Sequence, residues 1–151
     1  MSAAENKAII RRYVEELNRR NLAVLDEVIA QEVSLGSLLR GESTPEKVSQ
    51  ARYKEQIIER ITPFPDYQVK IEEMIAEDDQ VVLYWTNRRT HTAEFLGVPP
   101  TGKEIVEAAI SIYRLAGGRI VEVRGFWDRA DTWQQLGLIP ADDQIIPVNQ
   151  D

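Results

Sequence analysis

Apolar residues recur at helical spacing in the first part of the chain. Over residues 5–20 they fall on one face of a helix and charged residues on the other, which predicts an amphipathic helix. The apolar positions of this helix are Ile9, Ile10, Tyr13, Val14 and Leu17. A second, shorter helix is predicted after Asn21, whose side chain can cap it. A short extended segment is expected over residues 32–39.

A third helix is predicted from the residues that would begin it. Ser43 supplies a hydroxyl cap, Pro45 stands in the first turn, and Glu46 is placed to return a capping-box bond to Ser43. We therefore expect this helix to run from residue 43 to about Thr62, where Pro63 stops it.

The period changes from helix to strand after Asp66. Apolar and polar residues alternate over residues 67–75, 81–92, 103–115 and 119–128, where β-branched and aromatic residues are frequent. The turn dipeptide Gly117-Gly118 joins the last two runs as a hairpin, and Gly137 is placed to end a last short helix. Helices followed by long antiparallel strands indicate an α+β fold, with the helices on one face of a curved sheet.

Composition narrows the function classes. The 151 residues are one domain's length, and we expect that domain to span residues 1–140, followed by a C-terminal tail over residues 141–151. The formal net charge of −7 argues against nucleic acid and anionic membranes as partners. No apolar run has the length of a signal peptide core or a membrane span, so a cytoplasmic protein is expected.

Metal and thiol chemistry find little support in the sequence. The absence of cysteine excludes disulfides and thiolate catalysis, and a single histidine is too few for a multi-histidine metal centre. No loop concentrates Asp and Glu at the spacing of metal ligands. We therefore expect no metal site.

Residues 90–140 carry a resemblance to a known family. The matching segments are THT around His91, EFLGVPPTGK, IYRLAGGRIVE, Trp127-Asp128 and a closing QQLG. Together they resemble the SnoaL-like polyketide cyclases of the nuclear transport factor two-like superfamily. The resemblance implies a cone-shaped fold, in which about three N-terminal helices pack on one face of a strongly curved antiparallel sheet around a pocket.

The chemistry implied by the resemblance is the intramolecular aldol closure of a polyketide, without a cofactor. It needs one general base and hydrogen-bond donors near the enolate oxygen. In the family the base is a carboxylate, which we associate with a His-Trp-Asp pattern. This chain has Val123-Arg124-Gly125 at that place, so both the histidine and the acid are missing.

Three residues are candidates for acid-base catalysis in place of the missing acid: Asp128, His91 and Glu107. Asp128 matches a second family aspartate, but it also precedes a helical stretch that it can cap. His91 can exchange protons near neutral pH, although a strand end also suits a partly solvated histidine. Glu107 has apolar neighbours, the setting in which a buried carboxyl can act as a base; an outward position on a half-exposed sheet is the alternative.

Candidate ligand contacts follow from residue type. Trp85, Tyr113 and Trp127 can stack on a flat aromatic ligand, and membership of the core is the alternative for each. Val123 and Gly125, at the places of the family's histidine and acid, are expected to leave a roomier and drier cavity. The neighbours Arg88 and Arg89 can pair with a substrate anion, or with solvent at an edge.

Strand parity leaves the lining of the pocket open. The strand over residues 103–115 has one clean apolar face, formed by Val106, Ala108, Ile110 and Ile112. Its other face is mixed and contains Glu107, Ala109, Ser111 and Tyr113. Either face can line the pocket, because a β-bulge would exchange them partway along the strand.

Two main function hypotheses remain. The first is a cyclase or isomerase that acts on a hydrophobic carbonyl-containing small molecule. The second is a non-catalytic module of the same fold that binds such a molecule. Epoxide hydrolysis is a third possibility, for which Asp128, Arg124 and Glu107 would have to come together. Since three short helices cannot cover all apolar faces of the sheet, a homodimer formed through the sheet is expected.

Overall fold

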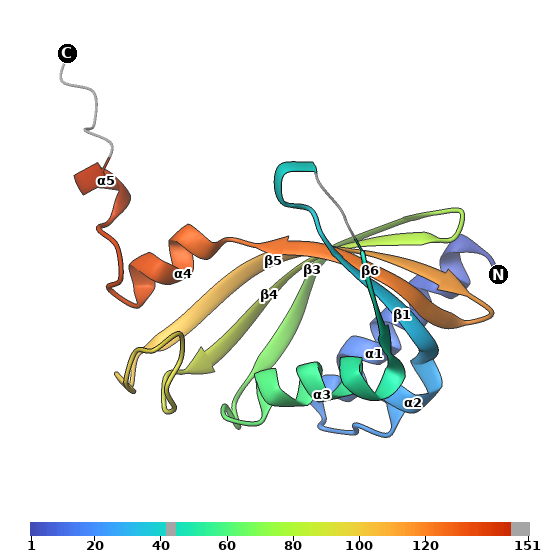
Figure 1. The fold of residues 1–151 in the computed structure, drawn as a ribbon, viewed down its shortest axis with the longest axis horizontal. Coiled ribbons are helices and arrows are strands. Elements are labelled where there is room, and N and C mark those ends of the chain that lie inside the picture. Colours follow the sequence, from blue (N-terminus) through green and yellow to red (C-terminus); the bar gives the residue numbers. More distant parts are fainter. Residues whose placement is uncertain (42–44, 146–151) are drawn as a thin grey trace, which may run out of the picture.

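The computed structural model describes residues 1–41 and 45–145 of the chain (Figure 1). Its elements in chain order are α1 (Ala3–Asn18), α2 (Val24–Val28), β1 (Ile29–Ser37), the 3₁₀ helix η1 (Leu39–Gly41), β2 (Glu46–Ser49), α3 (Gln50–Ile61), β3 (Gln68–Glu77), β4 (Gln80–Thr90), β5 (Glu104–Ala116), β6 (Arg119–Trp127), α4 (Arg129–Gln135) and α5 (Asp142–Ile145). No helix within the described ranges is both long enough and apolar enough to cross a membrane.

The six strands form one curved, open sheet in the order β2-β1-β6-β5-β4-β3. Helices α1, α2 and α3 lie together on one side of it (Figure 1), which confirms the predicted α+β cone. Every neighbouring pair of strands is antiparallel except β1 and β6, which run parallel. The sheet is therefore mixed. The alternation of residues within single strands does not tell which strands run parallel.

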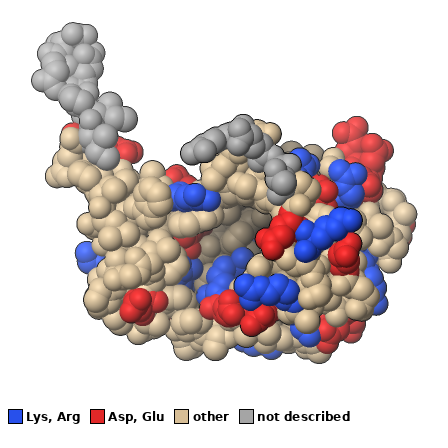
Figure 2. Space-filling model, viewed as in Figure 1, with Lys and Arg blue, Asp and Glu red and all other residues tan. Residues whose placement is uncertain are grey.

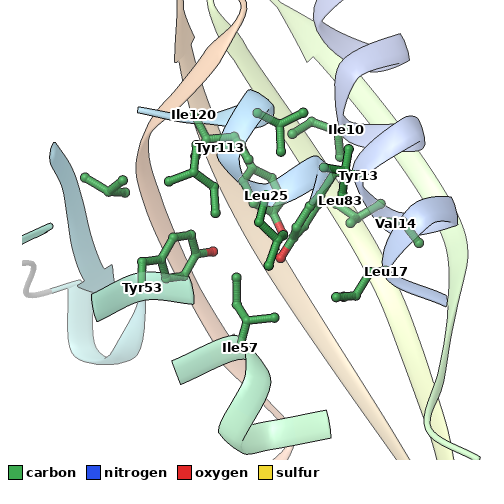
Figure 3. Close-up of a cluster of buried hydrophobic side chains, with 14 of the residues drawn as sticks. Ile10, Tyr13, Val14, Leu17, Leu25, Tyr53, Ile57, Leu83, Tyr113 and Ile120 are labelled. Carbon is green, nitrogen blue, oxygen red and sulfur yellow. The ribbon is translucent and has the colours of Figure 1, made fainter. Parts of the chain in front are cut away.

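Helix α1 forms as its sequence predicts. The Ser2 hydroxyl accepts a hydrogen bond from the Glu5 N–H at 3.1 Å, and the Glu5 carboxylate accepts one from the Ser2 N–H at 3.5 Å, which completes a capping box. The apolar face of the helix packs on the sheet and forms part of the hydrophobic core (Figure 3). Its core residues are Ile10, Tyr13, Val14 and Leu17.

The start of the third helix differs from the prediction. Residues 46–49 form β2, which pairs with β1, and α3 begins only after its N-cap, Ser49. Residues 43 and 44 of the predicted capping box lie outside the described residues. Val48 is 8% exposed and lies opposite Val33 in the strand pair, so this pairing buries an apolar side chain. Burial in the tertiary structure overrides the local cap signal.

Smaller connections were predicted with mixed success. Asn21 is not the cap of α2, because the N-cap is Ala23 and the Asn21 amide donates instead to Glu16 Oε2 at 2.6 Å. Gly117 and Gly118 both have positive φ in the β5–β6 turn, as the hairpin requires. Residues 142–145 of the predicted tail form α5, which lies beyond α4 and away from the sheet (Figure 1); residues 146–151 lie outside the described part.

Candidate functional site

The concave side of the sheet contains a cavity of about 310 Å³. Its wall comes from β4, β5 and β6, with one residue of α3 and one of the loop that follows β4. The space-filling view shows a hollow on this side of the molecule, between α3 and α4 (Figure 2). The lining residues are Arg60, Trp85, Asn87, Arg89, Phe95, Glu107, Ala109, Ser111, Gly125, Phe126 and Trp127.

The mixed face of β5 is the inner one. Glu107, Ala109 and Ser111 line the cavity, whereas the clean apolar face of the strand points away from the helices. On β6, Gly125 lies opposite Ser111 and Trp127 lies opposite Ala109, so these two residues face inward as well. The structure thereby answers the question of parity that the sequence left open.

The polar centre of the cavity is an ion pair between Arg89 and Glu107. Arg89 Nη2 lies 2.8 Å from Glu107 Oε1, and the two side chains are only 2% and 8% exposed. Thr132 of α4 donates its hydroxyl proton to Glu107 Oε2 at 3.0 Å, and Arg89 Nη1 donates to Asn87 Oδ1 at 3.1 Å. A buried ion pair is favourable only when its other hydrogen-bonding groups are also satisfied, and Thr132 and Asn87 meet part of that need.

Three aromatic rings surround the guanidinium of Arg89. Its Cζ atom lies 4.2 Å from the ring centroid of Phe95, 4.7 Å from that of Phe64 and 5.6 Å from that of Tyr67. Cation–π attraction is stronger where water is excluded. The rings therefore hold Arg89 in place, and through the ion pair they also fix the carboxylate of Glu107.

Trp85, Ser111 and Gly125 meet further along the inner face. Trp85 Nε1 donates to Ser111 Oγ at 3.0 Å. A Cβ atom at position 125 would lie 2.9 Å from the carbonyl oxygen of Ile110 and 3.2 Å from Ser111 Oγ. Because one of these neighbours is backbone, any side chain at position 125 requires a shift of β5 or β6. Glycine fits there because the two strands approach so closely.

Buried tyrosines converge beside this inner face. The hydroxyl ends of Tyr13, Tyr53 and Tyr113 point toward one another from α1, α3 and β5 (Figure 3). The rings of Tyr13 and Tyr113 meet edge to face, with centroids 6.3 Å apart. Burial raises the pKa of all three hydroxyls, and the charge of Arg60 acts in the opposite direction. These tyrosines are therefore neutral near pH 7.

The three predicted acid-base residues occupy different surroundings. Glu107 lines the cavity, as described above. Asp128 is exposed at the start of α4, where its Oδ1 accepts a hydrogen bond from the Asp131 N–H at 3.0 Å as the N-cap. It is not among the lining residues, although the Thr132 hydroxyl that contacts Glu107 also lies 3.3 Å from the carbonyl oxygen of Asp128.

His91 is completely buried just after β4 and is also absent from the lining. Its Nδ1 lies 2.9 Å from Thr101 Oγ1, and its Nε2 lies 3.2 Å from the carbonyl oxygen of Val98. Both ring nitrogens are thus engaged with the loop between β4 and β5. The imidazole ties that loop to the end of the strand.

The predicted ligand contacts divide in the same way. Trp85, Gly125 and Trp127 line the cavity. Tyr113 belongs to the hydrophobic core, and Val123 is partly buried against that core. The set imagined for epoxide hydrolysis is not assembled, since Arg124 pairs with Glu122 at 3.1 Å on the other side of β6. Within the described residues, no group of three His, Asp or Glu side chains is arranged to hold a metal ion.

Sequence reasoning missed the partners of Glu107. Asn87 and Arg89 share the inner face of β4 with Trp85, and in the β4–β5 register Asn87 lies directly opposite Glu107. A correct strand register would have placed them together. No sequence signal identifies Thr132, because its contact depends on how α4 docks against β5.

Comparison with known families gives a single result. The family model described as SnoaL-like polyketide cyclase matches residues 7–136. No curated protein matches the sequence.

Solved structures of similar chains cover nearly the whole molecule. AclR from Streptomyces galilaeus, a candidate hydroxylase, is 27% identical over 96% of this chain and 88% of its own, with a TM-score of 0.80. A candidate polyketide cyclase from Acidithiobacillus ferrooxidans is 27% identical over 91% of this chain and 99% of its own, with a TM-score of 0.76. IdmH from Streptomyces antibioticus, another candidate polyketide cyclase, is 26% identical over 87% and 98%, with a TM-score of 0.75.

Proposed function

We propose that this chain, which belongs to the SnoaL-like polyketide cyclase family, binds a hydrophobic carbonyl-containing small molecule and promotes its intramolecular aldol-type cyclisation, with Glu107 as the general base. The observation that carries the proposal is that, among the described residues lining the cavity, Glu107 is the one carboxylate. Trp85 and Trp127 supply flat apolar walls, which suit a flat hydrophobic ligand.

The proposed reaction is balanced without a cofactor. The carboxylate of Glu107 takes a proton from a carbon beside a carbonyl, and the C–H electron pair moves into an enolate. The enolate carbon attacks a second carbonyl carbon of the same molecule, which forms a C–C bond and leaves an alkoxide. The carboxylic acid of Glu107 then returns the proton to this alkoxide, so that the protein is regenerated.

Arg89 and Thr132 are proposed as positioning residues. Thr132 donates a hydrogen bond to Glu107 Oε2, and Arg89 Nη2 pairs with Oε1 at 2.8 Å, so each carboxylate oxygen has one partner and keeps a further lone pair for the substrate. Since aromatic rings confine Arg89, the carboxylate is held in one orientation toward the cavity. Orientation of this kind lowers the entropic part of the barrier before the reaction begins.

Asn87 is proposed as the hydrogen-bond donor to the enolate oxygen. It lies opposite Glu107 across the β4–β5 pair, and its Oδ1 accepts a hydrogen bond from Arg89. That bond orients the amide and leaves its NH₂ group to donate to the substrate. A donor beside the base is placed where negative charge develops during proton removal.

The test compares the wild type with Glu107→Gln and Asp128→Asn on polyketide-type substrates that carry ketones positioned for aldol closure. Glu107→Gln keeps the shape of the side chain but cannot take a proton, so kcat/KM should fall by about 10²–10⁴-fold. Asp128→Asn is the matched control, because asparagine also caps helices, and it should retain turnover. Undiminished turnover in Glu107→Gln would overturn the assignment of the base.

A second function, ligand binding without catalysis, is favoured by the residues at the family's acid site. Val123 has no polar side-chain group there, and the close strand contact at Gly125 leaves no room for an acid. If the protein only binds its ligand, added substrate should quench the fluorescence of Trp85 and Trp127, and no product should form. Fluorescence and product analysis on the same samples therefore separate the two functions.

We also propose that the outer face of the sheet joins two copies of the chain. Ile75 and Tyr84 are 58% and 40% exposed on that face, beside a groove that Val82 and Ile110 also line. Exposed apolar surface of this kind marks an interface, and a twofold dimer would cover it with the same surface of the second copy. Sedimentation velocity at micromolar concentration should give a dimer; a monomer would contradict the proposal.

A further inference from the structure

Arg60 is the second cation of the cavity, and its surroundings differ from those of Arg89. It lies near the end of α3, is exposed, and lines the cavity with its Cζ 5.9 Å from the ring centroid of Trp85. Among residues 1–41 and 45–145, no carboxylate lies within ion-pair distance of it. Arg89, by contrast, is neutralised by Glu107.

The polar groups around Arg60 do not balance its charge. The guanidinium acts electrostatically on the hydroxyls of Tyr13, Tyr53, Tyr67 and Tyr113. Burial raises the pKa of each of these hydroxyls, so they stay protonated near neutral pH. Neutral phenols can donate hydrogen bonds to a bound anion, but they carry no compensating charge.

The charge of the cavity is opposite in sign to that of the molecule. The described lining holds Arg60, Arg89 and a single carboxylate, whereas the whole chain has a formal net charge of −7. Basic and acidic side chains both lie along the edge of the hollow, so the excess of positive charge belongs to the lining itself (Figure 2). A cationic cavity attracts an anion locally even when the remaining surface repels it. One carboxylate on the ligand would restore neutrality, and its two oxygens match the planar fork of a guanidinium.

We infer that Arg60 binds a carboxylate of the ligand, so that the cavity prefers hydrophobic carbonyl compounds bearing a carboxylate over the corresponding esters. The inference rests on the proposed function, because it assumes that the ligand occupies the cavity that Glu107 lines. It places the acidic end of the ligand at α3 and the reactive carbonyl near Glu107 and Asn87. Trp85, which contacts Arg60, provides the apolar surface between the two ends.

A matched pair of probes tests the preference directly. Anthraquinone-2-carboxylate and its methyl ester share the flat carbonyl-containing ring system and differ in the anion. Quenching of tryptophan fluorescence, checked by calorimetry, gives the Kd of each probe. The wild type should bind the acid about tenfold more tightly than the ester, the scale of one charge-assisted hydrogen-bonded contact. Arg60→Gln should weaken binding of the acid alone and abolish the preference.

Arg52→Gln provides the matched control on the same helix. It removes the same formal charge, but Arg52 pairs at the surface with Glu55 at 2.9 Å and does not line the cavity. The control should keep the preference of the wild type. Thermal melting of every variant checks folding. If Arg60→Gln does not fold, Arg60→Lys decides, because it keeps the charge but loses the planar fork, and its preference should lie between the wild type and none.

Several outcomes would overturn the inference. The wild type would contradict it by binding the acid and the ester equally well, or by binding neither probe. The variants would contradict it if Arg52→Gln and Arg60→Gln lost the preference equally. If the glutamine variant does not fold, an unchanged preference in Arg60→Lys would contradict it. The preference is a property of binding alone, so it can fail while turnover dependent on Glu107 stands. Conversely, a wild type that prefers the acid but forms no product contradicts the proposed base and leaves the carboxylate site intact.

Discussion

The two faces of β5 differ in the opposite sense to most half-buried strands. Between residues 106 and 113 the inner face is buried and carries a glutamate, a serine and a tyrosine, whereas the outer face is apolar and only partly buried. A strand that faces a core is usually more apolar on that side. Here Glu107 and Ser111 lie inside because they line a cavity, and the apolar side chains on the outside are the surface that we propose joins two copies.

Two neighbouring arginines show the same difference in their energetics. Arg88 points outward and pairs with Glu104 at 2.7 Å, with both side chains about 60% exposed. Arg89 points inward and pairs with Glu107 at 2.8 Å, with almost no exposure. Water screens the first pair, so it contributes little to stability. The second pair lies where an unbalanced charge is costly.

Arg89→Met gives the largest expected effect, because it leaves the carboxylate of Glu107 buried without its counter-ion. The free energy of unfolding should fall by about 3–5 kcal/mol, as measured by urea denaturation. Arg88→Met, the control on the outer face, should lower it by no more than about 1 kcal/mol.

Removing both inner charges sharpens this comparison. The double variant Arg89→Met with Glu107→Leu should recover most of the stability lost in Arg89→Met, since no unpaired charge is left in the apolar surroundings. Equal effects of Arg88→Met and Arg89→Met would show that the two faces do not differ in the way described.

Helices and strands could be predicted from the sequence better than the contacts between their side chains. The helical period of α1 and the alternation of the four long strands could be recognised because each depends on local residue order. The inner face of β5 could not, because hydrophobicity alone would have chosen the side of Ile110 over the side of Glu107. Alternation along the strand places Arg88 and Arg89 on opposite faces, but the sequence does not tell which of the two faces lines the cavity, and only the pairing with β5 brings Arg89 to Glu107. The family resemblance supplied the pocket but not the residues that line it.

A side chain added at Gly125 should disturb the packing of β5 against β6 at the inner face. Gly125→Ala places a Cβ 2.9 Å from the Ile110 carbonyl oxygen and should lower the free energy of unfolding by about 1–3 kcal/mol through overpacking. Gly125→Asp, which restores the residue type of the family's acid, should cost at least as much because the strands must separate further. Urea denaturation measures both. Wild-type stability in Gly125→Asp would mean that the strand contact yields easily and that an acid can be accommodated.

Alkaline pH should lower the free energy of unfolding through the buried tyrosines that pack beside the inner face. Burial raises the pKa of the Tyr53 hydroxyl well above its ordinary value of 10.0. Above that pH the unfolded chain releases the proton and the folded chain keeps it, so stability is fully present below pH 10 and falls as the pH rises. Tyr53→Phe should make this fall shallower, by up to about 1.4 kcal/mol per pH unit.

Tyr84→Phe is the matched control for the pH experiment, because Tyr84 is 40% exposed on the outer face. Urea denaturation of the wild type and both variants between pH 8 and pH 11, a range chosen to bracket about pH 10, gives the slopes. The change in slope should be larger for Tyr53→Phe. Identical slopes in the two variants would show that the buried tyrosine does not couple folding to pH.

A substitution on the outer face of the sheet should change the oligomeric state and leave the stability of the single chain nearly unchanged. Ile75→Lys adds a charge to an exposed strand residue, so it should change the free energy of monomer unfolding by only about 0.5 kcal/mol. It should nevertheless separate the dimer, because two like charges would meet across a twofold interface. Leu138→Lys is the control, since Leu138 is an apolar residue of similar exposure that follows α4, away from the sheet. Sedimentation velocity should show a monomer for Ile75→Lys and a dimer for Leu138→Lys. A dimer in both would place the interface elsewhere and leave the apolar face of β5 without its proposed partner.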